Sequence, residues 1–427
     1  MKFHVCLEPV KLKPLGIFLL FLIIPVYNGL TQNALDYYLK TARENNPGIK
    51  ENLSQVEKAA LQEKIIKAEF RGPKVFLTSD IFYPPLLPNK NDPKAIGYDP
   101  AITDGGLISA LVNVRQPVFN KQIVKTLNSQ AKVTGELGAD QARTAQHLLE
   151  KEVIDQYIVS YQSWSQISFM KDLTNQLTQQ KVLIETLAGQ GIYKKSDLLL
   201  IEIEMLRQTS EINNLQAIYN QNIYSLNEIC GITGNEDVIL APPQIQFKAD
   251  TIQSKFLEKF RLDSLQIKTN LDVANLKYNP QFNLYGNTGI NAIEFPGIQR
   301  KFGVGAGLSM IIPIYDGHQV NYVREQANID LRINNNYRQN FLIQKNNHQQ
   351  SILSTLKLLE QKIKTIESQL NEYQKLIELY KSELRTGELK IIDYMNTIRL
   401  FAGVQQDLVI CESSKMLIIN ENNFYNW

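Results

Sequence analysis

The sequence predicts a mainly α-helical protein with a smaller β-strand part, built from two copies of one long unit. Three observations lead to this fold class. Identical residues recur at one offset of 196 along the 427-residue chain, for example Pro117 and Pro313. Residues 120–188 and 319–384 contain no proline, which favours long helices. Four shorter segments alternate apolar residues with polar residues or glycine, as β-strands do.

The same offset relates Gly191 to Gly387 and Asp197 to Asp393. A period of this length is too long for a solenoid, whose units span a few tens of residues. We expect each copy to run in the order helix, strand, strand, long helix, bend, helix. The expected divisions are a leader at residues 1–29, a first repeat at 30–230, a linker at 231–252, and a second repeat with a C-terminal tail at 253–427.

The N-terminus reads as a secretory signal peptide. Residues 15–26 form a long apolar run, and Lys2, Lys11 and Lys13 precede it. A basic leader followed by an apolar core of about a dozen residues is typical of signal peptides and is shorter than a membrane-spanning helix. The alternative is a buried N-terminal helix. We place the cleavage near Gly29, where no small-x-small pattern marks the site.

Charge and cysteine content narrow the function classes. Cleavage near Gly29 reduces the 45 basic and 43 acidic residues of the chain to 42 of each, because the leader holds three lysines and one glutamate. A neutral mature chain argues against a nucleic-acid partner. Cys230 and Cys411 lie 39 and 24 residues from the two expected bends. At about 1.5 Å per helical residue this is a level difference of about 22 Å, so we expect two free, buried thiols.

A seven-residue apolar pattern runs through the helical segments. In the second copy, steps of four and three residues connect positions that are all apolar or aromatic: Ile352, Leu356, Leu359, Ile363, Ile366, Leu370, Tyr373, Ile377, Tyr380 and Leu384. The first copy repeats the pattern from Ile201 to Ile229, with polar residues at Gln208 and Asn222. A period of 3.5 residues predicts left-handed coiled-coil packing of helices about 100 Å long.

The alternating segments predict four strands. In residues 108–118 and 302–314 the even positions are mainly apolar, and many odd positions are polar or glycine. Residues 74–83 and 281–291 are expected to be their partners. Because the offset of 196 is even, both copies turn the same face outward. Strands of about ten residues with one apolar face fit a transmembrane barrel, and equally the half-buried strands of a soluble sheet.

Pro117 and Pro313 are expected at the strand-to-helix junctions, where a missing N–H removes little from a strand ladder. Four strands cannot close a barrel by themselves, and open strand edges are not tolerated in lipid. A membrane location would therefore require the chain to oligomerise.

This element order, with a Pro-aromatic-Asn/Asp turn after an inner strand, resembles the TolC-like outer-membrane efflux protein family. The best single match is GLSMIIPIYDG at residues 307–317, with Gln326 and Ala327 following on the helix. The resemblance covers essentially the whole mature chain. The turn motif is moderately specific by itself, and the duplication and the heptads make the match strong.

The resemblance implies a homotrimer in which each chain gives four strands to one twelve-stranded barrel in outer-membrane lipid. An α-helical tunnel would continue the barrel across the periplasm. Such proteins are passive exit ducts, catalyse no reaction and use no cofactor. The implied partners are a periplasmic adaptor (membrane fusion) protein and an inner-membrane pump of the RND or ABC type. The pump selects the exported substrate, which the sequence therefore leaves open.

In the family, the functional end of the tunnel is its ring of helix bends. The resemblance carries this role to two segments, which we expect to dock the adaptor: Gln190, Gly191 and Ile192 in the first bend, and Thr386, Gly387 and Glu388 in the second. Six residues after each glycine stands an aspartate, Asp197 or Asp393, which the resemblance places on the bore or in a latch between helices. Three Asp393 side chains in a narrow ring would favour cations.

Two positions depart from the family pattern. Leu389 stands where some relatives carry an arginine that pairs with the first repeat's aspartate, and Asn396 stands where related channels often carry a further acid. We expect these two residues to form the periplasmic gate together with Asp197 and Asp393. The basic residues available to replace the missing arginine are Lys194, Lys195, Arg385 and Lys390.

An alternative stays open for the two aspartates, which also suit the first turn of a helix through its dipole. The copies differ next to the shared glycine and aspartate, with Tyr193 against Leu389 and Leu200 against Asn396. Those mismatches are where the gate is expected.

Other chemistry finds little support. The sequence has no HExxH or CxxC spacing for a metal site and no glycine-rich phosphate loop, so we expect neither an enzyme nor a metalloprotein. A second function class remains open, a secreted periplasmic coiled-coil adaptor of the membrane-fusion kind, or a structural protein, whose strands form a soluble domain. Dependence on detergent would separate the two classes.

Overall fold

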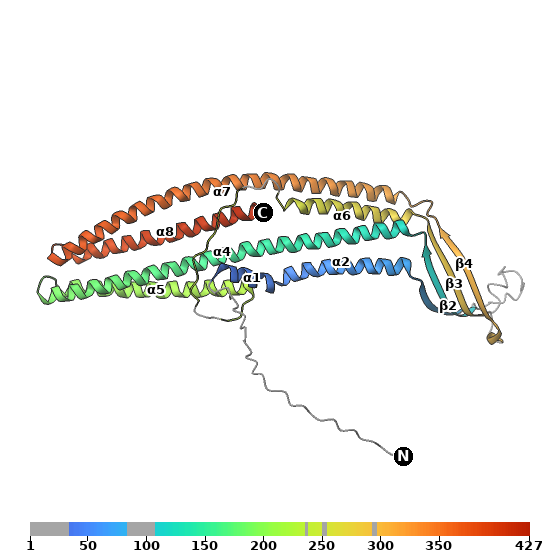
Figure 1. The fold of residues 1–427 in the computed structure, drawn as a ribbon, viewed down its shortest axis with the longest axis horizontal. Helices are drawn as coiled ribbons and strands as arrows, with labels where there is room; N and C mark the ends of the chain where they lie inside the picture. Colours follow the sequence, from blue (N-terminus) through green and yellow to red (C-terminus); the bar gives the residue numbers. More distant parts are fainter. Residues whose placement is uncertain (1–33, 83–106, 235–237, 250–253, 293–296) are drawn as a thin grey trace, which may run out of the picture.

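The structure is a computed structural model that describes residues 34–82, 107–234, 238–249, 254–292 and 297–427. The molecule is elongated, with a sheet at one end, two helix bends at the other, and long helices between them (Figure 1). The leader expected at residues 1–29 lies outside the described residues.

The described elements follow the same order in both halves of the chain. The first half contains α1 (Leu35–Asn45), α2 (Pro47–Arg71), β1 (Lys74–Phe82), β2 (Leu107–Val118), α4 (Lys121–Gly189) and α5 (Lys195–Cys230). The second half contains α6 (Leu257–Asn275), the 3₁₀ turn η1 (Leu276–Tyr278), β3 (Gln281–Ala292), the 3₁₀ turn η2 (Ile298–Arg300), β4 (Phe302–Ile311), α7 (Gln319–Thr386) and α8 (Ile391–Tyr425).

The two long helices are confirmed. α4 has 69 residues and α7 has 68, so each extends about 100 Å. Every heptad position from Ile352 to Leu384 is buried or half-buried on α7, which packs along α8. The apolar stripe read from the sequence is therefore the surface that holds this helical hairpin together.

The helices form a layer with two free edges. Near the sheet, α4 packs between α2 and α6, and α6 packs against α7. Near the bends, α4 packs against both α5 and α8, which also contact each other, and α8 packs against α7 (Figure 1). Helices α2 and α5 therefore lie at one edge of the layer and α7 at the other.

The sheet has the strand order β1-β2-β3-β4, and every neighbouring pair is antiparallel. In the β2–β3 and β3–β4 registers odd residues oppose odd residues, as in Asn113↔Asn287 and Tyr285↔Gly307. Directly opposed residues share a face of the sheet. The parity expected from the repeat is therefore confirmed, with the apolar even positions of β2, β3 and β4 on one face.

The last strand is shorter than expected. β4 ends at Ile311, whereas the alternating pattern predicted a strand to residue 314. Pro313 lacks an N–H and cannot extend the ladder. The chain turns instead, and the Asp316 carboxylate accepts hydrogen bonds from the N–H groups of His318 and Val320, both at 2.9 Å. The aspartate of the Pro-aromatic-Asp turn thus caps the start of α7.

The first junction uses a different contact. Pro117 lies one residue before the end of β2, opposite Asn283. The Asn120 side-chain amide donates to the carbonyl oxygens of Pro117, at 3.2 Å, and Phe70. This amide ties the end of α2 to the start of α4.

Cys230 and Cys411 are free and buried, as predicted. Among the described residues, none of the helices combines the length and apolarity that a membrane-spanning helix needs.

Candidate functional site

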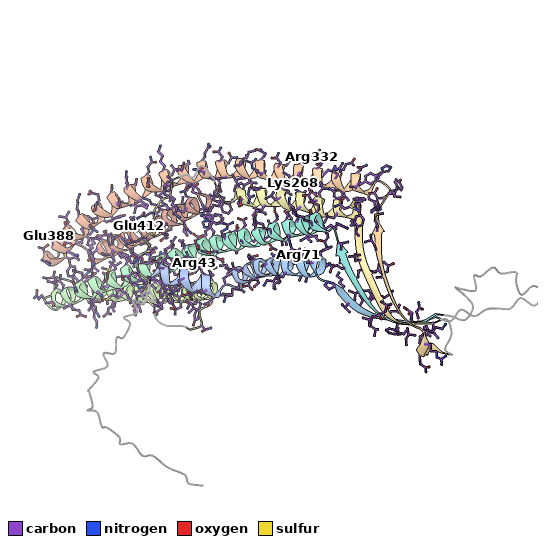
Figure 2. All side chains as sticks on the ribbon, turned by 45° about the vertical axis from the view of Figure 1, so that its right-hand side comes forward. Arg43, Arg71, Lys268, Arg332, Glu388 and Glu412 are labelled. Carbon is purple, nitrogen blue, oxygen red and sulfur yellow. The ribbon has the colours of Figure 1, made fainter. Side chains whose placement is uncertain are left out.

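The two helix bends lie together at the end of the molecule remote from the sheet (Figure 1). The first bend joins α4 to α5 through residues 190–194, and the second joins α7 to α8 through residues 387–390. The residues expected to dock an adaptor, from Gln190 to Ile192 and from Thr386 to Glu388, are all exposed. Figure 2 shows Glu388 at the tip of the second bend.

A glycine in the left-handed region reverses the chain at each bend. Gly191 has φ 83° and Gly387 has φ 78°, a conformation that residues with a Cβ rarely adopt. The Ile192 N–H donates to the Leu187 carbonyl, and the Glu388 N–H donates to the Glu383 carbonyl at 3.1 Å. Both bonds close a six-residue helix end of the Schellman type.

The bends also contact each other. The Tyr193 hydroxyl of the first bend lies 3.0 Å from the carbonyl oxygens of both Leu384 and Leu389 in the second hairpin. Because the hydroxyl has a single proton, the two carbonyl oxygens share it. The Tyr193 side chain is buried, so this hydrogen bond is shielded from water. A Cβ on Gly387 would lie 2.6 Å from the Ile192 methyl carbon Cγ2. The first bend is therefore fitted against the second.

A buried apolar cluster lies behind this contact. It draws side chains from all four helices of the two hairpins: Leu173, Leu177, Ile184, Leu187, Ile201, Ile377, Leu384, Ile391, Tyr394, Met395, Ile398 and Ala402. Tyr193 and Leu389 belong to the same cluster. Relative motion of the hairpins would expose part of this apolar surface to water. The free-energy cost of that exposure opposes the motion.

The two aspartates differ in their surroundings. The Asp197 carboxylate is half-buried and accepts a hydrogen bond of 2.9 Å from the Lys194 N–H, so it caps the start of α5. The Asp393 side chain is exposed in the first turn of α8, where the backbone N–H of Asp393 donates to the Lys390 carbonyl at 3.1 Å. The Asp393 carboxylate is therefore accessible to solvent, whereas the Asp197 carboxylate caps its own helix.

The other two predicted gate positions also differ. Leu389 is 9% exposed and packs inside the cluster, so its side chain contributes to packing in this conformation. Asn396 is exposed one turn along α8 from Asp393, and its side-chain oxygen lies 3.5 Å from a guanidinium nitrogen of Arg399. Asp393 and Asn396 thus share the exposed face at the start of α8.

A buried ion pair connects the hairpins farther along. The Glu204 side chain on α5 is fully buried and lies 2.6 Å from the Arg207 guanidinium and 2.7 Å from that of Arg399 on α8. Burial alone would raise the pKa of Glu204, but hydrogen bonds from both guanidinium groups hold it below its ordinary value. The carboxylate is therefore charged at neutral pH and joins the first hairpin to the second.

Known proteins with the same arrangement of helices and strands are found among solved structures. No protein-family model and no curated protein sequence matches the chain. Several solved structures do match, among them the following three. CusC has a TM-score of 0.71 at 13% identity, with 92% of each chain covered. The outer membrane protein VceC of Vibrio cholerae has a TM-score of 0.69 at 11% identity, with 92% of this chain and 96% of VceC covered. The CmeC outer membrane channel of Campylobacter jejuni has a TM-score of 0.67 at 13% identity, with 92% of this chain and 85% of CmeC covered.

The chain has the TolC-like fold. Coverage of 92% means that the similarity extends over most of the chain. The resemblance predicted from the sequence is therefore confirmed at the level of the fold.

In this TolC-like chain the contacts between the hairpins come from residues that sequence reasoning did not select. Tyr193 was noted as a mismatch between repeats, but its acceptors are backbone carbonyls, which carry no residue-type signal. The sequence gives only a weak signal for the pair of Glu204 with Arg399, because Glu204 is one of two glutamates, with Glu202, in the mainly apolar segment 198–206. Among the described residues, no group of three or more His, Cys, Asp or Glu side chains is placed to hold a metal ion.

Proposed function

We propose that the chain is the passive outer-membrane exit duct of a tripartite efflux or secretion system. Three copies form the duct, which crosses the outer membrane and extends into the periplasm. The fold supports this proposal, since the similar structures include an outer membrane channel. The observation that carries it is the sheet, which has one exposed apolar face and two free edges.

The apolar face is formed by large side chains that are between 39% and 81% exposed: Val75, Leu77 and Ile81 on β1, Val112 and Val114 on β2, Leu284 on β3, and Phe302, Val304, Leu308 and Met310 on β4. The helices that the structure describes leave these side chains exposed. An apolar surface of this extent calls for lipid or a partner chain. Strands of 9 to 12 residues match the length that a tilted strand needs to cross a bilayer.

The free edges support a homotrimer. β1 and β4 each pair on one side within the chain, and strand edges must be paired inside a membrane. Three sheets of four strands joined edge to edge give a closed barrel of twelve. The helix layer has matching edges, with exposed apolar residues on α7 at one edge and on α2 and α5 at the other: Tyr322, Ile329, Ile333 and Tyr337; Leu53, Leu61 and Ile65; Ile203 and Leu206.

The bends serve as the gate and the docking site. An iris-like opening separates the second hairpin from the first, which requires loss of the Tyr193 hydrogen bond and of the Glu204–Arg399 pair. A periplasmic adaptor protein docks on the exposed glycine turns, and an inner-membrane pump of the RND or ABC type supplies the energy. The duct itself catalyses no reaction.

Reconstitution tests the proposed function. The mature protein, extracted in detergent, is expected to have the mass of three chains and to form discrete conductance steps in a planar lipid bilayer. A protein that stays monomeric and soluble without detergent would overturn the duct and favour the secreted adaptor. A detergent-dependent trimer that never conducts, even with Tyr193 and Glu204 substituted, would overturn the exit path.

A further inference from the structure

One cross-strand row of the sheet concentrates positive charge. Lys74 on β1 is directly opposite Arg115 on β2, Arg115 is opposite Tyr285 on β3, and Tyr285 is opposite Gly307 on β4. Directly opposed residues share a face, so these four side-chain positions lie in one line across the polar face. The row lies close to the helical end of the sheet, because Lys74 begins β1.

The two cations of this row differ in how they are neutralised. The Lys74 ammonium lies 3.1 Å from the Glu69 carboxylate at the end of α2. Arg115 is exposed, and among the described residues it forms no ion pair. Like charges directly opposite each other on a sheet are destabilising, so the pairing of Lys74 with Arg115 calls for an explanation.

The other rows of this face carry no such charge. The next row consists of Phe76, Asn113, Asn287 and Gly305. Toward the far end, Asp80 lies opposite Ser109, whose hydroxyl donates to the aspartate at 3.3 Å. Arg115 is thus the unneutralised charge on the described polar face near the helices.

We propose that Arg115 forms a ring of three guanidinium groups at the base of the barrel, which makes this part of the duct selective for anionic solutes. The proposal rests on the proposed trimeric duct, in which the polar face lines the water-filled bore. Rings of charged side chains set the ion selectivity of pores, and arginine rings favour anions and phosphates.

The radius of the barrel decides how close a solute in the bore comes to the guanidinium groups. Twelve strands about 4.8 Å apart, tilted by about 40°, close into a barrel with a backbone radius of about 12 Å. An arginine side chain reaches about 6 Å inward, so a solute on the axis of the bore lies about 6 Å from the guanidinium tips. This distance is shorter than the Debye length of about 8 Å at physiological ionic strength, so salt does not screen the ring completely.

The rest of the row leaves the arginines prominent. A Cβ on Gly307 would lie 2.5 Å from the Tyr285 ring, so the ring lies over the glycine, against the wall. Tyr285 therefore narrows the bore less than an upright ring would. The cargo class that fits is a solute carrying a carboxylate, phosphate or sulfate group, since guanidinium groups pair with these anions in a bidentate geometry.

Selectivity measurements on the reconstituted full-length trimer test the ring. In a KCl gradient across a planar bilayer, R115Q is expected to lower the chloride-to-potassium permeability ratio at least twofold, and R115E to lower it further. R115K keeps the charge and should keep the ratio. K74Q should change the ratio less than R115Q, because Glu69 already neutralises Lys74. In vesicles, R115Q should slow uptake of gluconate relative to glucose, which is similar in size.

The outcomes separate this proposal from the proposed function. A permeability ratio that is the same in wild type, R115Q and R115E would overturn the ring while leaving the duct in place. A protein that neither trimerises nor conducts would overturn the duct and the ring together. A loss of selectivity in R115K equal to that in R115Q would show that side-chain shape, and not charge, is responsible, which also overturns the proposal.

Discussion

The hydroxyl of Tyr193 donates to the carbonyl oxygen of Leu389, the residue at the equivalent position of the second repeat. The two residues are 196 apart, which is the offset of the duplication. The two repeats have therefore diverged at this position. The first repeat has a tyrosine that donates a hydrogen bond, and the second has a leucine whose carbonyl accepts it and whose side chain packs in the apolar cluster. The hydrogen bond holds the bends in one relative position, so the proposed opening of the bends would have to break it.

Removal of this hydroxyl should loosen the bends. Tyr193→Phe keeps the ring in the cluster but leaves the Leu384 and Leu389 carbonyls without their donor. The expected effect is a loss of about 1 kcal/mol from the closed state and a higher open probability in planar bilayers. Tyr380→Phe is the matched control, because Tyr380 packs against the same cluster. An equal change in both variants would assign the effect to the ring surroundings and not to the hydrogen bond.

The Glu204–Arg399 pair should make closure sensitive to acid. The pKa of Glu204 is held below its ordinary value of 4.5, so its stabilising contribution is complete above that value and is lost as pH falls through the lower folded-state pKa. We expect wild-type conductance to rise as pH falls below 4.5, and Glu204→Gln to show the raised conductance already at pH 7.

The control for this prediction is Glu202→Gln on the same helix. Glu202 pairs with Lys181 at 2.9 Å within the first hairpin, so its loss should leave the contact between hairpins intact. Conductance that rises equally in both variants would contradict a latch at Glu204.

Asp393 should act on passing ions, whereas Asp197 should act on helix stability. Asp393→Ala is expected to reduce block by divalent cations in bilayers without changing the trimer, because its carboxylate is exposed and serves no cap. Asp197→Ala removes the cap on the Lys194 N–H and should lower thermal stability by about 1 kcal/mol. Unchanged cation block in Asp393→Ala would remove this residue from the gate.

The two bend glycines should respond differently to alanine. Both have positive φ, which makes alanine unfavourable by about 1 kcal/mol at either site. At Gly387 the added Cβ would also meet the Ile192 methyl carbon at 2.6 Å, whereas Gly191 faces open space within 4 Å. Gly387→Ala should therefore lower the melting temperature more than Gly191→Ala, and Ile192→Ala should rescue part of the difference. Equal melting temperatures would show that the bends are not in contact.

The two faces of the sheet should differ in their tolerance of charge. Val304, on the apolar face, is 81% exposed, and its replacement by Arg should cost about 2 to 4 kcal/mol at the centre of a bilayer and reduce the amount of trimer in membranes. Asn287→Arg on the polar face is the matched control and should assemble normally. Normal membrane assembly of both variants would contradict the assignment of the apolar face to lipid.

Much of the fold was available from the sequence because it depends on short-range periodicity. The absence of proline and the heptads predicted α7 to within two residues, and the even offset predicted which face of β2 and β4 is apolar. The prediction of two free thiols is correct because the rise per residue hardly varies between helices, so the difference in height between Cys230 and Cys411 could be calculated from their positions in the sequence. The bends expected at Gly191 and Gly387 follow from a backbone conformation that glycine adopts most readily.

The sequence by itself thus determined the duplication, the long helices, the strand faces and the two bends. Only the tertiary structure decided the strand register, the seating of Tyr193 on two backbone carbonyls and the pairing of Glu204 with Arg399, which are 195 residues apart. These contacts depend on how far each helix is rotated about its axis against its neighbour, and that rotation is set by the packing of the whole cluster between the hairpins. The same limit applies to Arg115, whose period-two position assigned its face, while its row with Lys74 and Tyr285 required the register.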